Sequence, residues 1–264
     1  MRSEDSAISS VVALMLILAI LVTCFSIYAT TYVPGVKQQA EIVHSAGVED
    51  AFGRISADID NLYAFERPVQ FTEAVVLGGG DFLLSPGRSS GTLTIGDRTI
   101  GNLTVNGNTT YLNTTVISYV PSFSAWELQG YRYENGTLWI TKGELETPLS
   151  YSFYSRDEGH AEANKSVVNR LKTMNASLSF SDPGNATLNV VTMKTVPGSS
   201  SVTGSGTAAV RLNATMQSKT TYNLSAGGGY SFSPSVPGET PFGYIASKSL
   251  NLTVRTFVIE VSVT

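Results

Sequence analysis

The chain has 264 residues, a formal net charge of −4 and only 14% charged residues, whereas 60 of its residues are Ser or Thr. This length suffices for one or two domains with a buried core, and the lack of a Lys/Arg-rich run argues against nucleic acid as a partner. A polar but nearly neutral surface is typical of extracellular β-proteins rather than of cytosolic enzymes.

The N-terminal segment is the most apolar part of the chain, because residues 8–33 contain no charged side chain. These 26 residues would extend about 39 Å as an α-helix, whereas a bilayer core of about 30 Å needs about 20 residues. We therefore expect a helix that spans a membrane. A cleaved secretory signal fits less well, because its apolar run is usually about 7–15 residues long and follows a basic leader.

The only cysteine, Cys24, lies inside this apolar segment, so an intramolecular disulfide is excluded. The tetrapeptide LVTC that ends at Cys24 is similar to a lipoprotein box. Lipidation is nevertheless not expected, because Thr23 is a poor residue before the cysteine and the apolar run continues beyond it.

The junction DSAISSVVALMLILAILV resembles the N-terminus of archaeal type IV pilins. This resemblance implies that residues 1–7 form a leader and that a prepilin peptidase cuts between Ala7 and Ile8. It also implies that residues 8–33 form a helix that leaves the lipid and packs into a bundle of identical helices. A permanent single-pass anchor remains the alternative interpretation of the same segment.

Residues 36–66 are expected to form an amphipathic stalk helix, with its core from Lys37 to Phe65 and its end before Pro68. Apolar residues recur there at steps of three and four, which is the spacing of one helical face. These residues are Val48, Phe52, Ile55, Ile59 and Leu62. Together with the apolar segment, they predict a long, kinked N-terminal helix that carries a globular head.

Residues 67–264 are expected to form a β-rich head, because short alternating segments are separated by turn residues. Tight hairpins are predicted at Gly96-Asp97, Asn106-Gly107 and Asn135-Gly136. The C-terminal strand changes face near Arg255-Thr256, which predicts a β-bulge. The whole chain is therefore assigned to the α+β class, with a mainly antiparallel β-sandwich.

Two further segments of the head are assigned. A short helix is expected from Glu158 to Met174, and a flexible loop is expected within residues 196–210. The hairpin YENGTLWI and the segment GSSSVTGSGTAAVRL also resemble the extracellular part of uncharacterised archaeal pilin-like membrane proteins.

Ten of the 14 asparagines begin an N-x-S/T sequon, which is more than the composition would give by chance. In the two NLTV segments, Asn and Thr should point outward while Leu and Val point inward. We interpret the sequons as N-glycosylation candidates, which would place the head outside the cell. They are Asn102, Asn108, Asn113, Asn135, Asn164, Asn175, Asn185, Asn213, Asn223 and Asn251.

The sequence has no phosphate-binding loop, no dinucleotide-binding motif and no Cys/His pattern for zinc, so we expect no cofactor and no metal. His44 is expected on the surface of the stalk, and RDEGHAE (156–162) as a solvated loop or helix start rather than a cation site. Trp126 and Trp139 are expected to pack against strands rather than to bind sugar. No nucleophile, base and orienting residue combine, so an enzyme is not expected.

The expected function is structural: a type IV pilin-like filament subunit or minor pilin, with a glycosylated head that serves adhesion or envelope attachment. The expected partners are the membrane, other copies of the chain through the N-terminal helix, the prepilin peptidase and the N-glycosylation machinery. The head would be extracellular, and the N-terminus cytoplasmic before processing. The alternative is a monomeric, membrane-anchored surface protein whose head binds a ligand or an envelope component. In the assembled form, small residues would allow helices to approach closely; these are Ser9, Ser10, Ala13 and Ala19.

Overall fold

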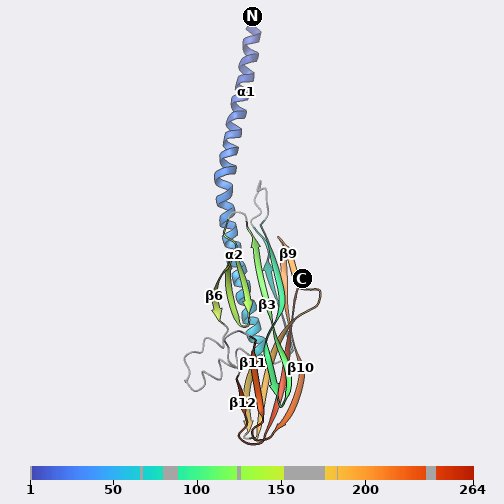
Figure 1. The fold of residues 1–264 in the computed structure, drawn as a ribbon. Coiled ribbons are helices and arrows are strands. Elements are labelled where there is room, and N and C mark those ends of the chain that lie inside the picture. Colours follow the sequence, from blue (N-terminus) through green and yellow to red (C-terminus); the bar gives the residue numbers. More distant parts are fainter. Residues whose placement is uncertain are drawn as a thin grey trace.

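The fold is one long N-terminal helix that ends inside a β-rich head (Figure 1). The computed structural model describes residues 2–65, 68–79, 89–123, 126–151, 176–182, 184–235 and 242–264. The head consists of two sheets whose strands are mostly antiparallel. The predicted α+β class with a long helix and a sheet-rich head is confirmed.

The helix is continuous from the first described residue into the head. It comprises α1 (Arg2–Ile27), a π-helical turn η1 (Tyr28–Tyr32) and α2 (Val33–Phe65). The N–H of Val33 bonds to the carbonyl of Tyr28, which widens the turn directly before Pro34. Because proline has no N–H and its ring crowds the preceding turn, a wider turn lets the helix pass through it. The helix therefore continues through Pro34 and Gly35.

The predicted apolar stripe of the stalk is the face that α2 buries. Its five residues are each at most 3% exposed. They face a core that both sheets contribute to, so the three-and-four spacing identified the buried face correctly. The stripe consists of Val48, Phe52, Ile55, Ile59 and Leu62.

The first sheet has five strands, and all neighbours are antiparallel except β13 and β8. In spatial order they are β1 (Val69–Val76), β10 (Thr207–Leu224), β13 (Leu250–Val263), β8 (Asn185–Thr195) and β7 (Ala176–Asp182). The C-terminal strand β13 is therefore the centre of this sheet. It is paired along both of its edges.

The second sheet has eight strands. Seven lie in the order β12 (Phe242–Ile245), β11 (Gly229–Pro234), β2 (Ser90–Val105), β3 (Asn108–Ser122), β4 (Gln129–Glu134), β5 (Thr137–Lys142) and β6 (Leu145–Tyr151). The eighth, β9 (Ser201–Gly204), pairs with the first part of β2.

The two sheets enclose two hydrophobic clusters, and only one of them includes the helix. The helix-side core joins the stripe of α2 to residues of both sheets, including Tyr119, Tyr131 and Phe257. The distal core contains residues from the sheets alone, including Phe232 and Leu252. The far end of the head, where β11 and β12 lie (Figure 1), is therefore a plain sandwich, whereas α2 fills the end nearer to α1.

Two of the three predicted hairpins are confirmed, and one is wrong. Asn106-Gly107 and Asn135-Gly136 form tight turns with positive φ at both residues, as a type I′ turn requires. No turn occurs at Gly96-Asp97, because β2 continues through it and pairs with β3 on both sides. The carboxylate of Asp97 is used differently: its Oδ1 accepts hydrogen bonds from Thr115 and Thr195, and so links β2 to the other sheet.

The change of face predicted for the C-terminal strand is confirmed, but the extra residue of the bulge lies on the partner strand β10 and not on β13. The register of β10 and β13 shifts between Met216 and Ser218, opposite Phe257 and Thr256. The segment expected to be a flexible loop contains β9, so that prediction was wrong for residues 201–204. The short helix expected from Glu158 to Met174 lies outside the described residues.

Candidate functional site

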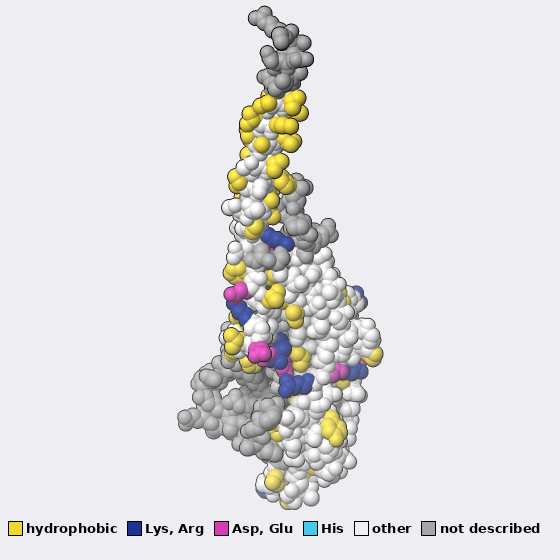
Figure 2. All heavy atoms as spheres, turned by 45° about the horizontal axis from the view of Figure 1, so that its top comes forward, with side chains coloured by type: hydrophobic (Ala, Val, Ile, Leu, Met, Phe, Trp, Pro, Cys, Tyr) yellow, Lys and Arg dark blue, Asp and Glu magenta, His cyan; other side chains and the backbone are white. Residues whose placement is uncertain are grey.

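The N-terminal helix carries a large apolar surface that the head does not cover. Every large apolar side chain from Val11 to Ile27, and Tyr32 after them, is more than half exposed. Figure 2 shows these side chains grouped along the helix, whereas the surface of the head is mostly neutral. Among the described residues, this is the one helix that is long and apolar enough to cross a membrane. Ala7 and Ile8 lie within α1, so the backbone is helical on both sides of the predicted cleavage point.

The burial of the helix changes at η1. Tyr28 and Tyr32 stack with ring centroids 5.4 Å apart, and Val33, the next residue, is only 8% exposed. Paired tyrosines at the end of an apolar helix are typical of the boundary between lipid and water. The head therefore begins directly after this stacked pair of tyrosines.

The buried face of α2 is polar in its first turns. Lys37, Glu41 and Ser45 continue the spacing of the apolar stripe toward α1, and all three are buried. Glu41 accepts a hydrogen bond from Ser89 at 2.7 Å. Sequence reasoning missed this polar continuation, although extending the same three-and-four spacing upstream of Val48 would have found it.

His44 connects α2 to β3, and its expected position on the surface was wrong. The side chain is half-buried, and its ring packs edge-on against Tyr119 and Phe123. Its Nε2 lies 3.1 Å from the Tyr119 hydroxyl oxygen. That hydroxyl donates its hydrogen to the carbonyl of Leu77, so Nε2 of His44 is the donor.

Burial sets the protonation of this pair. Burial lowers the pKa of His44, against the weaker raising effects of the Leu77 backbone and the charge of Glu41. Burial also raises the pKa of Tyr119. Both groups are therefore neutral in the folded protein near pH 7.

A second tyrosine, Tyr131 on β4, makes an equivalent connection one turn further along α2. Its hydroxyl donates to Glu49 at 3.1 Å and accepts a hydrogen bond from Gln129 at 2.7 Å. The hydroxyl of Ser45 also lies 3.1 Å away. Burial raises the pKa of Tyr131. These contacts fix the helix on the second sheet.

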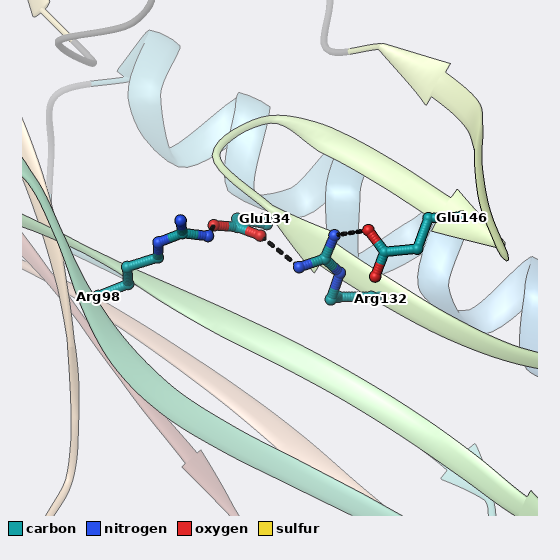
Figure 3. Close-up of polar contacts among 4 residues, drawn as sticks. All are labelled: Arg98, Arg132, Glu134 and Glu146. Carbon is teal, nitrogen blue, oxygen red and sulfur yellow. Dashed lines mark hydrogen bonds and ion pairs between the residues drawn. The ribbon is translucent and has the colours of Figure 1, made fainter. Parts of the chain in front are cut away.

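A ladder of charges crosses the outer face of the second sheet (Figure 3). Arg98 pairs with Glu134, which pairs with Arg132 at 2.7 Å, and Arg132 pairs with Glu146 at 2.5 Å. The alternation of sign joins β2, β4 and β6. Each ion pair on such a surface contributes little stability, so we interpret the ladder as fixing the register of β2, β4 and β6.

One of the two tryptophans packs against an arginine of the neighbouring strand. The guanidinium of Arg132 lies over the ring of Trp139, 5.7 Å from its centroid, and covers that face. Trp139 also pairs across the strands with Arg132 and Pro148, as expected for strand packing. Trp126 is half-buried in the segment before β4.

The sequons lie on both sheets. Asn164 and Asn175 are outside the described residues. Of the others, three are half-buried, namely Asn102, Asn113 and Asn135, and five are exposed, namely Asn108, Asn185, Asn213, Asn223 and Asn251. In both NLTV segments Leu and Val are buried, and Asn and Thr are not, so the predicted orientation is confirmed.

Three of the exposed sequons form one row across the first sheet. Asn223 on β10 is the register partner of Asn251 on β13, and Asn251 is the register partner of Asn185 on β8. Nδ2 of Asn251 donates to Oδ1 of Asn185 at 3.2 Å. Sequence alone gives no signal for this row, because Asn185 and Asn251 are 66 positions apart in the chain and become neighbours only in the folded sheet.

The described residues contain no cluster of three or more His, Cys, Asp or Glu side chains that could hold a metal ion. The charged segment RDEGHAE lies outside them. Comparison of the chain with protein-family models, curated proteins and solved structures gave no match.

Proposed function

We propose that this chain is a type IV pilin-like surface protein, with a structural role as a filament subunit or minor pilin. One observation supports the proposal most: within a single continuous helix, the exposed apolar surface ends at Tyr32 and the buried face begins at Val33. The first part then packs in lipid or against other helices, and the second part holds the head. The change occurs within one turn, so the head is carried at a fixed distance from the apolar part.

The outer face of α2 supports contact between copies rather than a solitary anchor. Gly35, Gly47 and Gly53 lie there, and a Cβ added to any of them would meet no atom within 4 Å. Glycine inside a helix costs about 0.5–1 kcal/mol relative to alanine, and nothing in the described head requires it at these positions. Close approach of a second helix would explain all three. Ile42 and Val43, 40% and 66% exposed, lie on the same outer face.

The head would face the outside of the cell and serve adhesion or envelope attachment. Its surface is polar with few charges (Figure 2), and five of its sequons are exposed. N-linked glycans on such a surface would supply solubility and protection.

N-terminal sequencing of the protein purified from its own cells tests the processed form. The proposal expects a mature chain that begins at Ile8, and a mature chain that retains Met1 would exclude cleavage. Electron microscopy with an antibody against the head tests assembly. Labelled filaments would support a filament protein, whereas diffuse label over the envelope would favour the monomeric, membrane-anchored alternative.

A further inference from the structure

The sequons of Asn185, Asn251 and Asn223 are far apart in the sequence, but they are neighbours in one row of the first sheet. We propose that the two outer asparagines, Asn185 and Asn223, carry N-glycans and that the central one, Asn251, stays unmodified. This inference rests on the proposed function, in which the head is exposed to the N-glycosylation machinery.

The spacing of the strands is the first argument. Neighbouring strands lie about 4.8 Å apart, so side chains in one row on one face are separated by the same distance. The contact of 3.2 Å between the amides of Asn251 and Asn185 shows that their side chains already touch. A glycan on Asn251 would have to extend outward between the side chains of Asn185 and Asn223, one on each side. Asn185 and Asn223 are two strand spacings apart, about 10 Å, which leaves room for a sugar on each.

The position of β13 is the second argument. It is the last strand of the chain, and it lies between β10 and β8, which are both synthesised earlier. Asn185 and Asn223 therefore reach the glycosylation machinery before Asn251 does. When β13 pairs with both strands, Asn251 enters a row whose outer positions are already occupied.

The chain contains its own control for this argument. Asn213 lies on the same strand as Asn223 and is also exposed. Its register partners are Gln70 on β1 and Glu260 on β13, and neither begins a sequon. Asn213 therefore resembles Asn223 in its strand, its exposure and its sequon, but neither of its register partners can carry an N-glycan.

The test is site-resolved mass spectrometry of glycopeptides from the protein expressed in its own cells. We expect glycan on Asn185, Asn223 and Asn213, and none on Asn251. In the double variant Thr187→Val with Ser225→Ala, which removes both outer sequons and keeps all three asparagines, Asn251 should gain a glycan. Thr253→Val, which removes the central sequon, should leave the total glycan mass unchanged, whereas Thr215→Ala should lower it by one glycan.

Two results would overturn the inference. One is a glycan on Asn251 in the wild-type protein. The other is an Asn251 that stays bare when both outer sequons are removed. A chain with no glycan even on Asn213 would instead contradict the glycosylated head of the proposed function, so the two failures are distinguishable. The first result is tested by glycopeptide analysis of the wild-type protein alone, so it does not depend on whether the variants fold.

Discussion

Nε2 of His44 on α2 lies 3.1 Å from the hydroxyl oxygen of Tyr119 on β3, and this hydroxyl donates a hydrogen bond to the carbonyl of Leu77. The helix is thereby joined to the second sheet and to the end of β1 through two side chains. The contact lies where the buried face of α2 changes from apolar to polar. Burial of the imidazole disfavours its charged form, so the attachment of the helix is sensitive to pH.

The first prediction is that the head loses stability as the pH falls below about 6.5, the pKa of an unperturbed histidine. Burial lowers the pKa of His44 in the folded state. Between the folded and the unfolded pKa the unfolded chain therefore binds more protons, so the free energy of unfolding rises with pH and is fully regained above the unfolded value. Urea unfolding of the detergent-solubilised chain at several pH values measures this dependence.

His44→Gln is the matched variant, because its amide can still donate to Tyr119 but does not titrate. Its free energy of unfolding should depend less on pH than that of the wild type. Identical pH profiles for the two proteins would show that His44 is not the group responsible.

The second prediction concerns the packing of α2. Phe52 is fully buried in the helix-side core, and its ring centroid lies 6.0 Å from that of Tyr131. Phe52→Ala should lower the free energy of unfolding by about 3–5 kcal/mol, because it removes a large buried side chain and leaves a cavity. Val43→Ala, on the exposed side of the same helix, should change it by less than about 0.5 kcal/mol. Equal effects of the two substitutions in urea unfolding would mean that α2 is not held by this face.

The third prediction separates stability from assembly. Gly47→Ala and Gly53→Ala should each stabilise the monomer by about 0.5–1 kcal/mol, because alanine is the better helix former and has room there. The same variants should reduce filament formation in electron micrographs, since the added methyl groups separate neighbouring helices.

Gly91→Ala is a contrasting control, because the added Cβ would lie 2.4 Å from the ring of Tyr119. It should destabilise the monomer itself. If the Gly47→Ala and Gly53→Ala variants form filaments normally, the glycines on the outer face of α2 no longer support contact between copies.

The fourth prediction concerns Asp58 on α2. Burial raises its pKa, and the charge of Glu73 on β1 raises it further, although Arg54 acts in the opposite direction. The folded state therefore prefers the protonated acid, and this group lowers the free energy of unfolding as the pH rises above about 3.9. Asp58→Asn should be more stable than the wild type near pH 7, and the difference should vanish in acid. Asp50→Asn, at an exposed position of the same helix, is the control and should show no such difference.

The local patterns of the chain predicted the elements that depend on neighbouring residues. The uncharged run of residues 8–33 predicted an apolar helix, and the stripe from Val48 to Leu62 predicted the face of α2 that is buried. Asn106-Gly107 and Asn135-Gly136 predicted turns because their dipeptides favour positive φ at both positions. Gly96-Asp97 has a similar local composition, but the pairing of β2 with β3 outweighed it.

By itself, the sequence determined an uncharged helix, a buried stripe, the sequons and an alternation typical of β-strands, because each of these is a property of residues close together along the chain. Only the tertiary structure decided that His44 meets Tyr119 and that Asn185, Asn251 and Asn223 share one row. Those contacts depend on the order and register of strands that are distant in sequence. Register is fixed by the packing of the whole sandwich, and no local pattern contains it.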